Sequence, residues 1–303
     1  MSSFHGGQSN DDYDHRSLKH ERQMMATYRT ASARDGASLQ PLANSCWRAA
    51  CFEWKLYRSV GTTRRLLGEA ARTLARGFLR RRPGFDPNPE QYILGLHASI
   101  AARERDAFIA LAAADPNPRT GILREARAFL GSRTHFRLAE GYALVARAVI
   151  EREQAKAREA CQMLEAARVE NEREWWERQF PDPLEAAWRN SEHEAVCVLL
   201  AAVAGRIVSE AEAAEAGQTL DESEETLKSF ASVVDRALER LQEFVERDVN
   251  HHPKLYLWLP GIALCGLASS AGVPLDWLER QHEANNPVYQ RLPLELLGNQ
   301  PSN

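Results

Sequence analysis

The sequence predicts an all-α protein in which about nine helices, arranged in antiparallel pairs, form one helical bundle or array. Three observations predict this fold. Apolar residues recur with the helical period along most of the chain, no stretch alternates as an amphipathic strand does, and clusters of Pro, Gly and Asn separate the periodic stretches. The repeat period of a tetratricopeptide array is absent, so such an array is not expected.

The first half of the chain begins with a polar stretch. We expect residues 1–37 to form a mobile polar arm, followed by a single all-helical domain over residues 38–303. Gly61 should end the first helix of that domain, and Thr62 or Thr63 should cap the second. The helices expected here cover residues 39–60, 62–82, 90–111 with a break near 103–104, 122–130, and 132–150.

The second half contains the most apolar segment of the chain. Residues 184–207 should form a helix at the centre of the core, because apolar side chains occupy several of its faces. Residues 209–225 read as a polar connector. The other helices expected here are a charge-rich one over 151–179, one from Asp221 or Ser223 to about 247, and two short apolar ones within 253–297.

The composition is that of an ordinary soluble protein, with 44% hydrophobic and 26% charged residues. The longest apolar stretch, residues 195–204, is about half as long as a bilayer span, so no membrane association is expected. The first ten residues do not form a secretory signal, and the five cysteines form no CxxC pair. These features predict a cytoplasmic location with reduced, buried thiols.

Motifs for catalysis or metal binding are missing from the sequence. It has no HExxH, no P-loop, no GxGxxG and no GxSxG. A di-iron bundle needs two Glu-x-x-His units, and only Glu279 to His282 has that spacing. Asp11, Asp12 and Asp14 lie in the expected arm, where no core would hold them rigid. We therefore expect no enzyme activity, no cofactor and no metal site.

A net charge of −4 hides a charge asymmetry along the chain. The first 82 residues hold 15 Lys and Arg against 7 Asp and Glu, and the remainder holds 23 against 35. Arginines between Arg58 and Arg82 could follow nucleic-acid phosphates, or they could pair with the chain's own carboxylates. Aromatic residues for base stacking are not interleaved with them, so we expect no direct binding of nucleic acid.

An acidic block lies between residues 210 and 225, where seven carboxylates occur without a Lys or Arg. Such a cluster produces a negative potential that steers a basic partner and speeds its association. Trp175 and Trp176 follow a Glu-rich run and belong to the residue type that anchors interfaces. The alternative interpretation is a solvated loop together with two core tryptophans.

Two stretches carry a family resemblance. The first runs from Tyr92 to Leu111 (YILGLHASIAARERDAFIAL), and the second from Leu257 to Leu275 (LWLPGIALCGLASSAGVPL), followed by RLPLELL at 291–297. Both are similar to the immunity protein 49 family of bacterial polymorphic toxin systems. The first stretch resembles the family's Ala-rich helix, which contains an Arg followed by an acidic residue. The second resembles the family's closing pattern, in which an apolar helix is followed by a Gly turn and a Leu-Pro segment. The resemblance implies a cytoplasmic antidote that binds a toxin without chemistry.

Resemblance and charge together lead to one hypothesis. The chain would be a cytoplasmic immunity protein that inhibits a cognate secreted toxin, such as a type VI secretion effector acting on nucleic acid, by occluding its basic active-site cleft. The alternative is a non-enzymatic helical-repeat scaffold that binds another protein or peptide. An all-α enzyme with a carboxylate metal site and a nucleic-acid binder are less favoured. The candidate toxin-binding residues are Trp175, Trp176, Glu192, Glu194, Glu210, Glu212, Glu215, Asp221, Glu222, Glu224 and Glu225.

Overall fold

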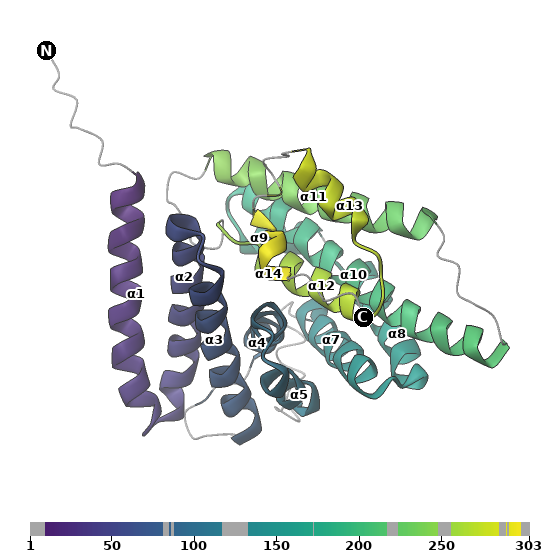
Figure 1. Cartoon of the computed structure of the whole chain (residues 1–303), viewed down its shortest axis with the longest axis horizontal. Coiled ribbons are helices and arrows are strands. Elements are labelled where there is room, and N and C mark those ends of the chain that lie inside the picture. Colours follow the sequence, from purple (N-terminus) through teal and green to yellow (C-terminus); the bar gives the residue numbers. More distant parts are fainter. Residues whose placement is uncertain are drawn as a thin grey trace, which may run out of the picture.

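The computed structural model describes residues 10–80, 85, 88–116, 133–171, 173–216, 224–247, 256–284, 289 and 291–297. Over these residues the chain is all-α without strands, and its helices pack as an antiparallel array (Figure 1). The predicted fold class is therefore confirmed, although this part of the chain contains more helices than the nine expected. None of the helices in the described ranges is long and apolar enough to cross a membrane.

Helix α1 (Asn10–Ser32) begins the array, where a mobile arm was expected. Leu18 and Met25 of α1 are buried in the core, and the helix packs along α2 (Leu39–Tyr57) after a short 3-10 turn, η1 (Gly36–Ser38). Asp14 is also buried and accepts a hydrogen bond of 2.9 Å from the Tyr256 hydroxyl. The expectation of a mobile arm was therefore wrong from residue 10 onward. Only a few apolar residues form the buried stripe of α1, so the helical pattern is hard to recognise among its polar residues.

Helix α3 (Val60–Arg80) follows α2 after a turn that was expected to contain Gly61. Instead, Arg58 ends α2 in the left-handed region with φ of 50°, and its N–H donates to Trp54 O. Gly61 lies inside α3, and the Ser59 hydroxyl accepts from the N–H of Thr62 at 3.4 Å. The predicted cap at Thr62 or Thr63 was therefore wrong by one helical turn.

Helices α4 (Pro89–Ala102) and α5 (Arg105–Ala113) correspond to the third predicted helix with its break. Asn88 caps α4, since its Oδ1 accepts from the N–H of Gln91 at 2.9 Å, and Pro89 occupies the first helical position. Arg103, with φ of 60°, separates the two helices as predicted. The helix expected over residues 122–130 lies outside the described residues.

The next four helices are α7 (Arg133–Glu151), α8 (Gln154–Val169), α9 (Arg173–Gln179) and α10 (Pro183–Ala216). The charge-rich segment predicted as one helix forms two, α8 and α9. Helix α10 continues nine residues past its predicted end at Ile207, so residues 209–216 are helix rather than connector. Alanine is the strongest helix former, and its repetition over 211–216 explains the extension.

The last helices are α11 (Glu224–Arg247), α12 (Leu259–Ser270), α13 (Asp276–Glu283) and α14 (Leu294–Leu297). The predicted end of α11 is confirmed. The closing region contains three helices rather than two. Its first helix, α12, packs against both α4 and α10, which joins early and late segments of the sequence.

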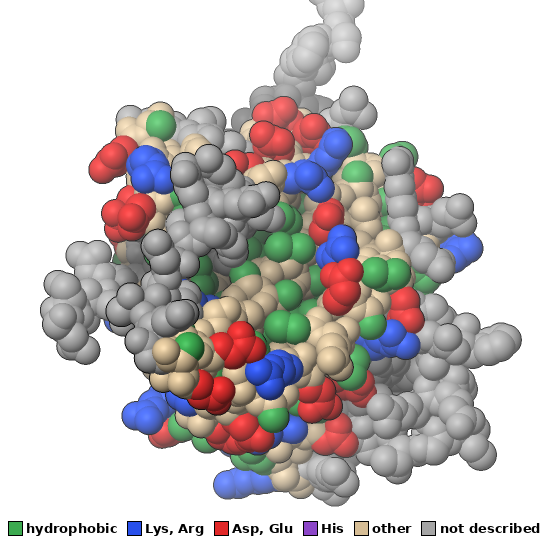
Figure 2. Space-filling model, turned by 90° about the vertical axis from the view of Figure 1, so that its right-hand side faces the viewer, with side chains coloured by type: hydrophobic (Ala, Val, Ile, Leu, Met, Phe, Trp, Pro, Cys, Tyr) green, Lys and Arg blue, Asp and Glu red, His purple; other side chains and the backbone are tan. Residues whose placement is uncertain are grey.

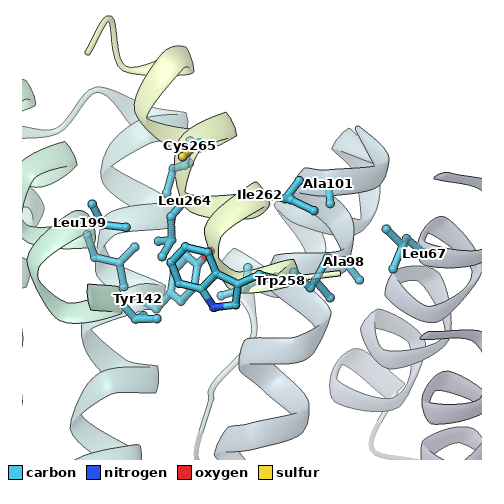
Figure 3. Close-up of a cluster of buried hydrophobic side chains, with 14 of the residues drawn as sticks. Leu67, Ala98, Ala101, Tyr142, Leu199, Trp258, Ile262, Leu264 and Cys265 are labelled. Carbon is cyan, nitrogen blue, oxygen red and sulfur yellow. The ribbon is translucent and has the colours of Figure 1, made fainter. Parts of the chain in front are cut away.

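Helix α12 supplies the centre of the core (Figure 3). Trp258, just before α12, and Ile262 and Leu264 within it are buried beside Tyr142 of α7 and side chains of α4 and α10. Helix α10, which was predicted to be the central helix, packs against α7, α8, α9, α11 and α12. It therefore shares the centre of the core with α12. The two stretches that carry the family resemblance, α4–α5 and α12 with its flanks, thus meet in one packed layer.

Candidate binding surface

Of the seven predicted toxin-binding residues whose side chains the structure describes, five lie on α10, and the seven form two separate clusters. One cluster combines Trp175 and Trp176 of α9 with Glu192 and Glu194 of α10. The other occupies the C-terminal end of α10. Glu194 and Glu210 are sixteen residues apart in one helix, which corresponds to about 24 Å at a rise of about 1.5 Å per residue. The described members of the predicted set therefore do not form one continuous docking patch.

Glu192 has a structural role. Its carboxylate accepts a hydrogen bond of 2.9 Å from the indole N–H of Trp258 and lies 3.6 Å from the guanidinium of Arg189. Only 16% of the Glu192 side chain is exposed. It therefore anchors α10 to the start of α12. Its neighbour Glu194 forms a partly exposed ion pair of 3.4 Å with Arg236 of α11.

The two tryptophans hold α9 against α10. Trp176 is only 4% exposed, its indole N–H donates to Asn171 Oδ1 at 2.7 Å, and its ring stacks on Phe180 and meets His193. The half-buried Trp175 packs edge-on against Trp176, with 4.7 Å between ring centroids. The interpretation of Trp176 as an interface anchor needs correction, because a side chain buried in this way is not presented to a partner.

The C-terminal cluster is more open. Glu210 pairs with Arg206 at 2.9 Å and Arg152 at 3.6 Å, and Glu212 pairs with Arg158 of α8 at 2.8 Å. Glu212 nevertheless stays 55% exposed, and Glu215 is exposed one turn further on. Asp221 and Glu222 lie outside the described residues, as do the side chains of Glu224 and Glu225 at the start of α11.

Arginines from other helices thus meet part of the acidic block. Sequence reasoning found no Lys or Arg among residues 210–225, yet Arg152 and Arg158 approach from the α7–α8 turn and from α8. The basic helix α3 behaves similarly: Arg72 pairs with Glu104, and Arg64 donates to the carbonyls of Glu295 and Leu296 at 2.9 and 3.1 Å. These contacts favour the interpretation in which charged residues pair within the chain.

The cysteine thiols are poor nucleophiles in this fold. Burial raises the pKa of Cys46, Cys197 and Cys265 to about 12, and burial also raises the pKa of Cys161. Cys197 Sγ lies 3.5 Å from His193 Nε2, one turn away on α10, but both side chains are buried. The described residues contain no group of three or more His, Cys, Asp or Glu placed to hold a metal ion.

Replacing Glu192 tests its structural role. We expect Glu192→Leu to lower the free energy of unfolding by about 2 kcal/mol, because the buried indole N–H of Trp258 loses its acceptor. Glu192→Gln keeps an acceptor oxygen and should lose less than half as much. Urea unfolding of both variants measures the difference. Equal losses in the two variants would show that the hydrogen bond is not what Glu192 contributes.

Comparison with known proteins gives no assignment: no family model, no curated protein and no solved structure matches the chain. The resemblance to the immunity protein 49 family therefore rests on the two stretches quoted above.

Proposed function

We propose that the chain is an immunity protein, which binds a toxin of a bacterial polymorphic toxin system in the cytoplasm and blocks it by covering its active site. The toxin is expected to act on nucleic acid and to present a basic cleft. The blockade requires no chemistry from the antidote, only a rigid surface of matching shape and charge.

The observation that carries this proposal is the meeting of the two resembling stretches. Helix α12, from the second stretch, packs on α4, from the first. Ile100 of α4 lies against Gly266 of α12, where an added Cβ would come within 3.1 Å of the isoleucine Cγ2. The two similar stretches contact each other in the core. Similarity in such contacting segments supports a common scaffold more strongly than similarity in two separate surface segments would.

The open end of α10 is the part of the candidate surface best suited to meet a basic cleft. Glu212 and Glu215 are exposed there, and residues 151–216 hold 15 Asp and Glu against 8 Lys and Arg. Figure 2 shows this side of the molecule, on which apolar side chains near the centre are exposed beside charged ones. An apolar centre within a charged rim is the usual arrangement of a protein interface.

Co-expression with the product of a toxin gene adjacent to the gene for this chain tests the proposal. The full chain is expected to restore growth of cells that make this toxin and to copurify with it at nanomolar affinity or better, about −12 kcal/mol. Absence of both rescue and binding would refute the function.

The docking end is tested separately by Glu212→Gln combined with Glu215→Gln. At low salt we expect this double variant to associate with the toxin about 10-fold more slowly than the wild type, because the steering potential is reduced. Glu279→Gln combined with Glu283→Gln on α13 is the matched control, since both side chains are exposed on another helix and the same charge is removed. If the double variant associates at the wild-type rate and the chain still rescues growth, the docking surface lies elsewhere on the antidote.

A further inference from the structure

A surface groove lies beside α1. It is an open cavity of about 370 Å³ between α1 and the C-terminal end of α2. Leu18 forms part of its wall, and His15, Lys19, Arg22 and Tyr57 provide the polar lining. Helix α1 stands at one end of the array (Figure 1), so this groove opens to solvent at the edge of the molecule.

The groove presents positive charge and an aromatic ring. Arg22 is bound to the buried Glu53 at 2.7 Å, whereas exposed Lys19 forms no ion pair with any described residue. Tyr57 is 51% exposed, and its hydroxyl lies 3.2 Å from His15 Nδ1. The surrounding residues 10–80 carry 13 Lys and Arg against 7 Asp and Glu. Lys19 and the partly exposed Arg22 make this lining complementary to an acidic partner.

The C-terminal end of α10 has that chemistry. Residues 209–216 alternate small alanines with Glu210, Glu212 and Glu215, and a helix C-terminus adds the negative end of its dipole. Small side chains allow the backbone of a helix to approach a groove closely. In Figure 1 the end of α10 and helix α1 lie at opposite ends of the longest axis, so these two surfaces cannot meet within one molecule.

We propose that the α1 groove binds the C-terminal end of α10 from a second copy of the chain. The contact joins two different surfaces, so each molecule keeps one free groove and one free α10 end, and association continues head to tail. It depends on exposed charges and is therefore weak and sensitive to salt. A toxin that docks on the α10 end would compete with this contact. Only this competition rests on the proposed function.

Sedimentation velocity of the purified full chain tests self-association without a toxin. The weight-average mass should increase with protein concentration at 0.01 M salt, where the Debye length is about 30 Å, and return to the monomer value at 1 M, where it is about 3 Å. A monomer at all concentrations and salts would overturn the proposal. So would a mass that stops at a dimer, because that result indicates a closed, symmetric contact.

Two charge reversals identify the surfaces. Lys19→Glu should disable the groove, and Glu215→Lys should disable the α10 end, so each variant alone is expected to remain monomeric at 0.01 M salt. An equimolar mixture of the two should associate again at 0.01 M salt, because the intact groove of one variant meets the intact α10 end of the other. Both substituted side chains are exposed, and circular dichroism verifies that the variants are folded.

A matched control separates local contact from net charge. Arg34→Glu changes the charge by the same amount as Lys19→Glu, but Arg34 lies beyond the C-terminal end of α1, outside the groove. The Arg34 variant should associate as the wild type does. Association of either single-reversal variant at wild-type strength, or failure of the mixture to associate, would overturn the assignment of these two surfaces.

Discussion

Gly261→Ala is expected to lower the free energy of unfolding by about 3 kcal/mol. An added Cβ at this position would lie 2.1 Å from Cε3 and 2.4 Å from Cζ3 of the Trp258 ring. Carbon atoms do not approach so closely, so either the ring or the start of α12 must shift. Trp258 is only 1% exposed and is fixed by its hydrogen bond to Glu192, which leaves little room for relief.

Urea unfolding of Gly261→Ala beside Gly61→Ala measures this effect. Gly61 is exposed in the first turn of α3, and an added Cβ there meets no described atom within 4 Å. Alanine has the higher helix propensity, so Gly61→Ala should be neutral or stabilising by up to about 1 kcal/mol. If Gly261→Ala unfolds at the wild-type urea concentration, Trp258 is less constrained than its contacts indicate.

This glycine shows what the sequence alone can and cannot predict. Apolar periodicity predicted the all-α fold and most helices, since burial of one face is a local property of each segment. The requirement for glycine at Gly261 depends on the position of the Trp258 ring, which is a tertiary property. Turn chemistry failed at the end of α2 for a related reason: Arg58 adopts a positive φ there, where glycine is the usual signal.

The candidate surface could be predicted only in part. Counting charges along the chain located the acidic end of α10, and Glu212 and Glu215 are indeed exposed there. It could not show that Arg158 of α8 approaches Glu212, because ion pairs between helices depend on packing order. The α1 groove was missed altogether, since its walls come from a segment whose apolar stripe was too sparse to predict a packed helix.

Lowering the pH from 7 to 4 is expected to destabilise the wild type by about 3 kcal/mol more than the variant His97→Leu. His97 of α4 is 4% exposed, and burial lowers its pKa from 6.5 to about 3. The ring of Tyr142 packs against it, with 5.4 Å between ring centroids, and no described residue forms a hydrogen bond with His97 Nε2. The folded core therefore keeps this imidazole neutral.

The direction of the effect follows from proton binding. Between pH 6.5 and about 3 the unfolded chain binds a proton at His97 and the folded chain does not, so stability falls as the pH falls through this range. Each pH unit below 6.5 is worth about 1.4 kcal/mol, which gives about 3 kcal/mol at pH 4. Carboxylates titrate in both proteins, and their contribution largely cancels in the difference.

Urea unfolding of wild type and His97→Leu at several pH values tests this expectation. At pH 7 the two should be similar, because leucine fills nearly the same volume and brings no unsatisfied nitrogen. Toward pH 4 the variant should become the more stable of the two. His20→Gln, which removes an exposed histidine of α1, is expected to keep the wild-type profile. If the difference in free energy of unfolding between wild type and His97→Leu does not change with pH, the α4–α7 contact accepts a protonated imidazole. His97 would then contribute to packing without making the core sensitive to acid.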